Sequence, residues 1–236
     1  MNKYFLIIVL LLASGPLAAA CNNPSSISKA PNIAACIAAA NSGDIEAQLA
    51  LGKLYIDGLT VPQNYEESLK WFRKAADQGN ARAIYNIGVF YDRGYGVEKS
   101  FEKAAEWYQK AADAGYPFAL YNIGVMYEYG QIFPKDLDKA RGYYLQAAEK
   151  GEPSAQFSLG LLYEKGLGVE QDLVKAYMWW DITGEGHRYA AHNRDSLEED
   201  MTPEQIAEAK QLARDWWTQR PHLKQLPPET YQPGFE

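Results

Sequence analysis

Apolar residues along the chain recur with the spacing of α-helices. Ala83, Ile87 and Tyr91 are four residues apart, so they lie on one face of a helix. A second apolar series with helical spacing follows and consists of Ala104, Trp107, Tyr108 and Ala111. Gly94 lies between the two series, where a left-handed residue is typical of a helix end. The pattern therefore predicts two helices joined by a turn.

This helix pair recurs with a period of 36 residues. In the first helix, the constant positions are Ala47, Ala83, Ala119 and Ala155; Gly52, Gly88, Gly124 and Gly160; Tyr55, Tyr91, Tyr127 and Tyr163; and Gly58, Gly94, Gly130 and Gly166. In the second helix, two aromatic series are Trp71, Trp107, Tyr143 and Trp179, and Phe72, Tyr108, Tyr144 and Trp180. Coincident series of this kind predict four tandem repeats, at about residues 47–82, 83–118, 119–154 and 155–190.

One helix pair cannot bury its own apolar face, so the repeats are expected to stack on one another. The small residues at Gly88 and Gly124 let two helices approach closely. The large aromatic side chains are then expected to fill the space between neighbouring repeats.

The repeat matches a known consensus. The string Ala-x3-(Leu/Ile)-Gly-x2-Tyr-x2-Gly is followed by Gly-Val and by Lys-Ala-x2-Trp-Tyr-x-Lys-Ala-Ala-x2-Gly, and residues 83–115 match it closely. It resembles the Sel1-like repeat, a relative of the tetratricopeptide repeat, and the resemblance extends over residues 46–184. The resemblance implies an all-α fold, a right-handed α-solenoid of helix-turn-helix repeats. The loops after Gly58 and Gly130 depart from the pattern, so the resemblance does not define their shape.

Capping helices are predicted at both ends of the repeats. An N-terminal tail and capping helix occupy 21–45, where Ile33–Asn41 aligns with a second helix and Cys36 takes the place of Phe72. C-terminal capping helices are predicted within 185–220, at Tyr189–Glu199 and Pro203–Thr218. Thr202 and Gln205 have the spacing of a capping box, and Pro203 suits the first helical position. The tail, 221–236, is rich in proline and glycine and is expected to be extended.

Residues 1–20 have the pattern of an export signal. Lys3 precedes an apolar run from Tyr4 to Ala13, and small residues stand at the −3 and −1 positions of a cleavage site before Cys21. The protein is therefore expected to be periplasmic or secreted, and a retained membrane anchor is the alternative. No later segment is apolar enough over a sufficient length to predict a stable membrane span.

The two cysteines, Cys21 and Cys36, allow several interpretations. An oxidising compartment favours a disulfide between them, which would attach the N-terminal tail to the capping helix. Cys21 also stands where a bacterial lipoprotein carries its lipid anchor, although Ala18 makes an imperfect lipobox. A free thiol, or the removal of Cys21 during processing, is also left open.

Composition and motifs favour binding over catalysis. The formal net charge of −7 argues against nucleic acid as a partner, because binding to phosphates needs clustered Lys and Arg. Two Ser-x-x-Lys strings, Ser26–Lys29 and Ser100–Lys103, lack the companion motifs of penicillin-recognising enzymes. The three histidines lack the spacing of a metal site: His187 and His192 are five residues apart and His222 is distant. We therefore predict no catalytic residues, metal or cofactor.

The informative positions are those that vary between repeats. In the first helix they are the register positions of residues 46, 50, 53 and 57, which form one stripe. This stripe faces away from Ala47, Leu51 and Tyr55, three residues expected in the core. We call this set the variable stripe: Ala50, Asn86, Asn122 and Ser158; Lys53, Val89, Val125 and Leu161; Asp57, Arg93, Tyr129 and Lys165; with Tyr85, Tyr121 and Phe157 at its edge. The resemblance implies that first helices line a concave groove. Amide, aromatic and cationic side chains suit a protein partner, and a merely solvated surface is the alternative.

These observations predict a non-enzymatic, monomeric scaffold or adaptor of the cell envelope, which binds a protein or peptide through the variable stripe. The resemblance implies several roles for exported members, including immunity proteins that neutralise a periplasmic effector. The alternatives are an enzyme active on β-lactams or peptidoglycan, and a scaffold that contacts the cell wall. Family members linked to β-lactams carry paired cysteines within each repeat, whereas the repeats here contain none.

Overall fold

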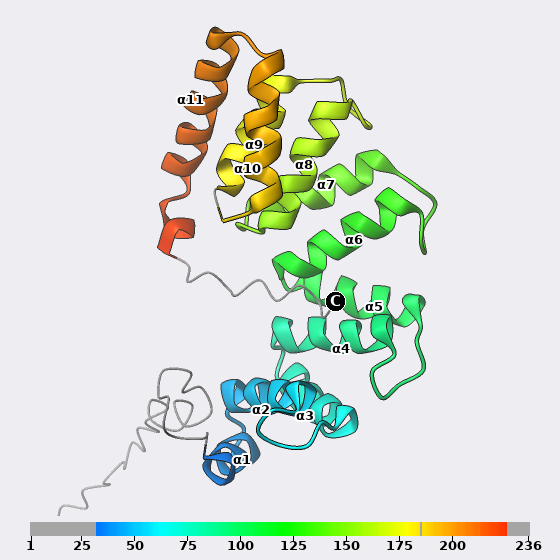
Figure 1. Ribbon diagram of the computed structural model, residues 1–236. Coiled ribbons are helices and arrows are strands. Elements are labelled where there is room, and N and C mark those ends of the chain that lie inside the picture. The colour runs from blue at the N-terminus through cyan, green and yellow to red at the C-terminus, as the bar shows by residue number, and fades with distance from the viewer. Residues whose placement is uncertain (1–31, 185, 226–236) are drawn as a thin grey trace, which may run out of the picture. The chain divides into compact units, whose positions relative to one another are not determined.

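The computed structural model describes residues 32–184 and 186–225, and all regular structure in these ranges is helical. The chain divides into two compact units, one ending at Ser100 and the other beginning at Phe101. The first unit contains α1 (Ile33–Asn41), α2 (Ile45–Asp57), α3 (Tyr65–Asp77) and α4 (Ala81–Arg93) (Figure 1). The second unit contains α5 (Phe101–Asp113), α6 (Pro117–Tyr129), α7 (Leu137–Ala148), α8 (Pro153–Lys165), α9 (Leu173–Thr183), α10 (Arg188–Leu197), η2 (Glu198–Asp200), α11 (Pro203–Gln219) and η3 (Pro221–Gln225).

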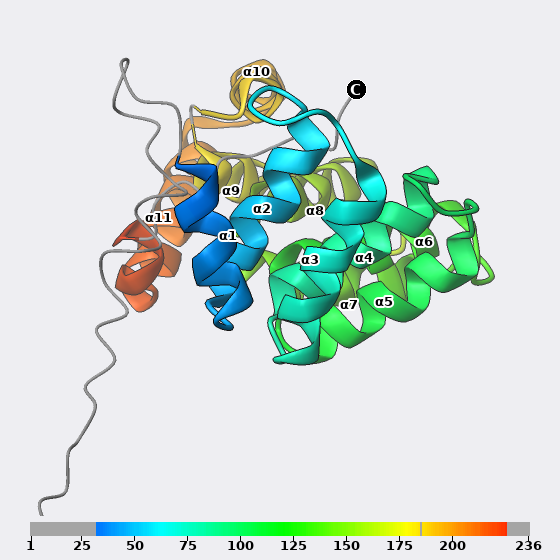
Figure 2. The ribbon, with the colours of Figure 1, turned by 90° about the horizontal axis from the view of Figure 1, so that it is seen from below.

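Helices pack in chain order within each unit. In the first unit, α2 packs between α1 and α3, and α3 also contacts α4. In the second unit, each helix from α5 to α9 packs against the next one along the chain (Figures 1 and 2). First and second helices of the repeats therefore alternate, as the period of 36 residues predicts.

Helix ends are set by residues that recur with the repeat. Side-chain oxygens accept hydrogen bonds from backbone N–H groups at the helix starts, at N-caps Asp44, Asn64, Asn80, Asp136 and Asp172. The first helices end at left-handed glycines, namely Gly58, Gly94, Gly130 and Gly166. Both features satisfy backbone groups that a helix end would otherwise leave without a partner. The predicted positions of the first-helix ends are confirmed.

The constant alanines form the centre of the packing between helices. Ala47, Ala83, Ala119 and Ala155 are completely buried. The glycines five residues later lie under an aromatic ring of the following helix: a Cβ added at Gly124 would come within 2.6 Å of Tyr144. Phe72 covers Gly52 and Trp180 covers Gly160 in the same way. These rings therefore fill space within their own repeat. Phe72 also meets Phe90 of the next repeat edge-on, with ring centroids 5.9 Å apart, so this ring packs between repeats as expected.

The constant tyrosine is less buried than predicted. Tyr55, expected in the core, is half-buried, and so are Tyr91, Tyr127 and Tyr163. In the second unit, the ammonium group of Lys139 lies 5.2 Å from the ring centroid of Tyr127, and Lys175 is similarly placed over Tyr163. Part of each tyrosine ring therefore remains accessible to water. The backbone of Tyr127 also takes part in the fold, because its C=O accepts a hydrogen bond from Asp136 N–H at 3.0 Å.

The loop after Gly130 differs from its counterparts. Phe133 stacks on Tyr127 with ring centroids 4.6 Å apart, and Tyr143 stacks on the same tyrosine at 5.8 Å. Ile132 stands at the register position of Gly96 and Gly168, and both of these glycines have positive φ. No described residue other than glycine has positive φ, so this loop takes another path and places an aromatic ring there.

The C-terminal helices begin close to the predicted positions. The capping box at Thr202 is present, with Gln205 N–H donating to Thr202 Oγ1 and Thr202 N–H donating to Gln205 Oε1. Trp216 is buried and its ring meets that of Trp179, 6.2 Å away between centroids. The start of the tail was expected to be extended, but Pro221–Gln225 form a 3-10 helix with Leu223 beside Gly151.

Several predictions fall outside the described residues. They concern the export signal at 1–20, Cys21 and the tail from residue 226 onwards. Cys36 is fully buried in α1, and its sulfur lies 3.9 Å from the carbonyl oxygen of Ala47. In the described ranges, no helix combines the length and apolar character required to cross a membrane.

Candidate partner-binding face

In the second unit, the variable stripe lies on the outward side of α6 and α8. Because Ala119 and Ala155 are buried on the opposite side of these helices, the stripe faces away from these two alanines. Those near the helix centres are half-buried: Tyr121, Asn122, Val125, Phe157, Ser158 and Leu161. The two at the C-terminal ends are exposed, and Tyr129 is 68% exposed. Lys165 is its counterpart on α8.

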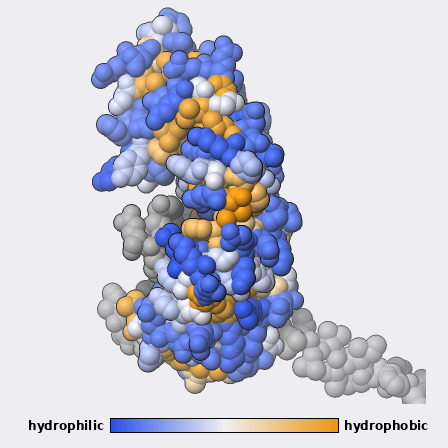
Figure 3. All heavy atoms as spheres, turned by 90° about the vertical axis from the view of Figure 1, so that its right-hand side faces the viewer, coloured by the Kyte–Doolittle hydropathy of each residue, from blue (hydrophilic) through white to orange (hydrophobic). Residues whose placement is uncertain are grey.

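In the first unit, α4 places Tyr85, Asn86 and Val89 in half-buried positions and Arg93 in an exposed one. The Arg93 guanidinium lies 3.7 Å from the Asp92 carboxylate. On α2, Lys53 and Asp57 form an ion pair with each other at 2.9 Å. Both cations therefore lie beside a neighbouring carboxylate, and their side chains are similarly exposed, 44% for Lys53 and 48% for Arg93. Figure 3 shows that, on the face drawn, apolar residues form separate patches among hydrophilic ones.

A hydrogen bond that sequence reasoning missed supports the stripe of α6. Tyr144 on α7 is fully buried, and its hydroxyl donates to Glu128 Oε2 of α6 at 2.5 Å. Burial and the neighbouring Glu128 carboxylate raise the pKa of Tyr144 well above its usual value, so the hydroxyl stays protonated. The sequence holds a signal for this bond: where Phe72 replaces the tyrosine, the position of Glu128 holds Ile56.

Helix α10 occupies the place of a first helix in a fifth repeat. Its N-cap, His187, follows the N-cap of α8, Glu152, by 35 residues, one fewer than the period. With this offset, Ala190 matches Ala155, and both are completely buried. Leu197 likewise matches the buried Leu162. The matched buried side fixes which side of α10 faces outwards.

Two residues missing from the predicted stripe follow from this register. Tyr189 corresponds to Ser154 and is 60% exposed, and Asn193 corresponds to Ser158 and is half-buried. The position of Asn86 and Asn122 thus holds an amide again on α10. Sequence reasoning missed these residues because the helix begins one residue earlier than a strict period requires.

Comparison with known proteins identifies the family. The model of the Sel1 repeat matches residues 45–80, 81–116, 117–152 and 153–182. The chain belongs to the Sel1 repeat family. Each matched segment begins two residues before the corresponding predicted repeat, and the fourth ends at residue 182 where the predicted repeat runs to 190. The resemblance found in the sequence is confirmed.

Solved Sel1 repeat structures are similar to this chain. One is a protective antigen of uropathogenic Escherichia coli with the same repeat fold, at 33% identity and a TM-score of 0.73 over 83% of this chain. This chain spans 43% of that protein. A Sel1 repeat protein of Oxalobacter formigenes is 32% identical, with a TM-score of 0.66 over 77% of each chain. These likenesses confirm the all-α Sel1 repeat fold.

A third similar structure is described as an immunity protein, Pa5087 of Pseudomonas aeruginosa. It is 23% identical, with a TM-score of 0.55 over 87% of this chain and 79% of that one, so it shows the fold alone. No curated protein matches the chain.

The C-terminal helices of this Sel1 repeat protein reduce the accessible part of the stripe. The ring of Phe157 stacks on His187, with centroids 4.7 Å apart, and also lies near Trp180. Leu161 packs against a core cluster that includes Tyr177 and Ala190. Phe157 and Leu161 therefore belong partly to the core, which makes them weaker contact candidates than Tyr129 and Lys165.

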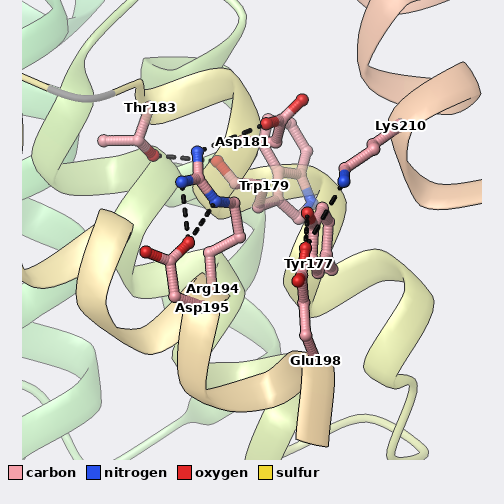
Figure 4. Close-up of polar contacts among 8 residues, drawn as sticks. All are labelled: Tyr177, Trp179, Asp181, Thr183, Arg194, Asp195, Glu198 and Lys210. Atoms are coloured by element: carbon pink, nitrogen blue, oxygen red, sulfur yellow. Dashed lines mark hydrogen bonds and ion pairs between the residues drawn. The ribbon is translucent and has the colours of Figure 1, made fainter. Parts of the chain in front are cut away.

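Polar contacts hold α10 in place (Figure 4). Arg194, at the register position of Leu159, lies 3.5 Å from the Asp181 carboxylate of α9 and 2.7 Å from that of Asp195. Tyr177 on α9 donates to Glu198 at 2.6 Å, and Lys210 on α11 lies 3.4 Å from the same oxygen. The hydrogen bond from Tyr177 lowers the pKa of Glu198, and burial raises that of Tyr177. The first group of contacts joins α9 to α10, and the second joins α9 to α11 through Glu198 of η2.

The histidines and the Ser-x-x-Lys strings considered for metal binding or catalysis do not form a common site among the described residues. Among the described side chains, no three or more His, Cys, Asp and Glu are grouped to hold a metal ion. His187 is an N-cap and stacks on Phe157, His192 is exposed on α10, and His222 lies in η3. Ser100 N–H donates to the carbonyl of Tyr91 at 2.9 Å, at the turn before α5. The other Ser-x-x-Lys string, at 26–29, is outside the described residues.

Proposed function

We propose that this Sel1 repeat protein is a non-enzymatic binding module of the bacterial cell envelope, which binds another protein through the variable stripe. The observation that carries the proposal is the contrast between constant and variable positions. The constant alanines are buried in the core, whereas the stripe places Tyr129 and Lys165 on the surface. Exposed tyrosine and arginine side chains are the residues that most often anchor protein partners.

Helix α10 is part of the proposed binding face. Tyr189 presents a large ring at one end of the helix, and Asn193 adds an amide that can donate and accept hydrogen bonds. The stripe of the second unit then consists of residues from α6, α8 and α10. We propose that a protein or peptide segment contacts these helices in succession, with the protein acting as a monomer.

The envelope location rests on the export pattern of residues 1–20. We propose that the mature chain begins near Cys21 and that Cys21 forms a disulfide with Cys36, while lipidation of Cys21 is the alternative. Mass spectrometry of the mature protein with and without reductant separates the two. A gain of two hydrogens on reduction supports the disulfide, and the added mass of acyl chains on the N-terminal peptide supports the lipid.

The first class of partner to test is a toxic effector that reaches the periplasm. The immunity protein of Pseudomonas aeruginosa has the same fold, although its identity of 23% is too low to carry its role over to this chain. The net charge of −7 also suits a neutral or basic partner. An effector encoded next to this protein would be the natural candidate for a binding experiment.

The proposal is tested with stripe and control variants against a partner recovered by affinity capture. The stripe variant combines Tyr129→Ala, Lys165→Ala and Tyr189→Ala, all in the second unit, and we expect its affinity to fall about tenfold or more, because anchors each contribute above 1 kcal/mol. The control variant combines Arg73→Ala, Glu106→Ala and Gln146→Ala, three exposed residues of second helices. Isothermal titration calorimetry gives both affinities. Equal affinities of the stripe variant and the unaltered protein would place the binding site elsewhere.

A further inference from the structure

Helix α10 begins with an N-cap that can change its protonation state. The backbone N–H of Ala190 donates both to Nδ1 of His187 at 3.2 Å and to the backbone carbonyl oxygen of His187 at 2.9 Å, and the backbone of His187 is extended. Nδ1 accepts this bond only while it carries no proton, because both nitrogens of an imidazolium are donors. The other described N-caps with a side-chain bond in the second unit use oxygen acceptors.

The same ring attaches the start of α10 to α8. The imidazole of His187 stacks on Phe157, with centroids 4.7 Å apart and planes inclined by 29°. Tyr189 meets the imidazole edge-on at 6.3 Å. The cap and the stack therefore depend on one side chain, whose position determines where the N-terminal turn of α10 lies.

The surroundings of His187 disfavour its charged form. Burial is the main cause that lowers the pKa of the imidazole below its usual value of 6.5. On its own helix, the neighbouring charged group is Arg188, whose guanidinium lies over Tyr189 at 5.2 Å. Helix α8 places the apolar ring of Phe157 against the imidazole. The charged groups of Asp181 on α9 and Arg194 on α10 form an ion pair with each other. Glu185 is outside the described residues. The positive end of the α10 dipole also opposes a charged imidazole.

We propose that His187 is a proton-operated latch, which holds the N-terminal turn of α10 against α8 when neutral and releases it when protonated. A proton from solvent takes the lone pair of Nδ1, so the N–H of Ala190 keeps only the backbone carbonyl of His187 as acceptor and lies against a cationic ring instead of a neutral one. The first turn of α10 then frays, and Phe157 loses its stacking partner. The latch concerns the docking of α10 alone and does not require the proposed partner.

Hydrogen exchange at the Ala190 amide, measured by NMR in the full chain and corrected for the intrinsic effect of pH, tests the latch. Between pH 7.5 and pH 4.5 we expect the protection factor to fall about fivefold, since an N-cap is worth roughly this factor. In His187→Asn, the side-chain oxygen can cap the helix without titrating, so protection is expected to remain high at both pH values. In His187→Ala, protection is expected to be low at both.

The control variant is His192→Asn, which changes an exposed histidine of the same helix and should retain the full pH-dependent fall. An equal fall in His187→Asn and in the unaltered protein would overturn the proposal. So would an unchanged protection factor in the unaltered protein across the range, or high protection in His187→Ala at pH 7.5.

Discussion

At the scale of single residues, a glycine beneath an aromatic ring sets the distance between the two helices of a repeat. The position of Gly124 cannot hold a larger side chain, because a Cβ there would lie 2.6 Å from the ring of Tyr144 and 3.2 Å from the carbonyl oxygen of Ala140. The ring cannot withdraw easily, since its hydroxyl is bonded to Glu128 on the helix that carries the glycine. Packing and hydrogen bonding therefore act on the same pair of helices.

Gly124→Ala is expected to destabilise the protein by about 2–4 kcal/mol, because the added methyl group overpacks the contact with Tyr144. Gly142→Ala is the matched control: this glycine lies inside α7, and an added Cβ meets no atom within 4 Å. The control should stabilise the protein by about 0.5–1 kcal/mol, because alanine favours the helix. Urea unfolding measures both. A Gly124→Ala variant as stable as Gly142→Ala would contradict the close approach.

Glu152 provides a test of pH dependence at the same scale. It caps α8 through a bond from Ala155 N–H, is 2% exposed, and its Oε1 has no partner. Burial raises its pKa above 4.5. A raised folded-state pKa means that the stabilising contribution is complete below 4.5 and is lost as the pH rises through the folded value.

Glu152→Gln removes this titration. We expect the unfolding free energy of the unaltered protein, relative to Glu152→Gln, to decrease by about 1–2 kcal/mol between pH 4 and pH 8. Urea titrations at the two pH values give the difference, and Glu170→Gln, at an exposed position, is the matched control. A constant difference between the unaltered protein and Glu152→Gln would show that Glu152 is solvated.

At the scale of elements, the C-terminal helices depart from the repeat while retaining part of its register. Helix α9 has 11 residues, against 13 in α5 and 12 in α7, and α10 begins one residue early. In α10, Ala190 and Leu197 are buried and still face the core. Arg194 stands at the register position of Leu159 and forms an ion pair with Asp181. Helix α11 packs mainly against α9, where a regular second helix would pack mainly against the helix before it, α10, so the repeat stops there.

The capping box of α11 gives the prediction at this scale. Thr202→Ala removes the acceptor for Gln205 N–H and should lower the free energy of unfolding by about 1 kcal/mol. Thr218→Ala, near the other end of the helix, loses only a bond to the carbonyl of Arg214 and should cost less. Thermal unfolding of both variants provides the comparison. If Thr218→Ala were the more destabilising change, the N-terminal cap would not be what holds α11.

The helices, their boundaries and the constant core could be predicted, because each repeats at a fixed interval and each has a local physical cause. The buried alanines and the glycine C-caps are examples. The bond between Tyr144 and Glu128, the stack of Phe157 on His187 and the register of α10 were not predicted. Each depends on distances between helices, or on a break in the period, and a pattern within a single repeat contains neither.

At the scale of the whole molecule, the Sel1 repeats supply a scaffold whose outward positions differ from one repeat to the next. The first repeat pairs its charges internally through Lys53 and Asp57. Later repeats keep Tyr129 and Lys165 exposed, and α10 adds Tyr189. The accessible chemistry of the variable stripe is therefore richest in the second unit, and we expect the partner to make its strongest contacts there.

Site-specific photocrosslinking in living cells tests this claim most directly. A photoreactive phenylalanine analogue replaces Tyr129 or Lys165 in the stripe, or the exposed Arg73 or Gln146 on second helices. Irradiation is expected to give one discrete higher-mass adduct that contains a second protein from positions 129 and 165, and none from positions 73 and 146. Adducts only from positions 73 and 146, or none from the stripe, would contradict a protein-binding role of the variable stripe.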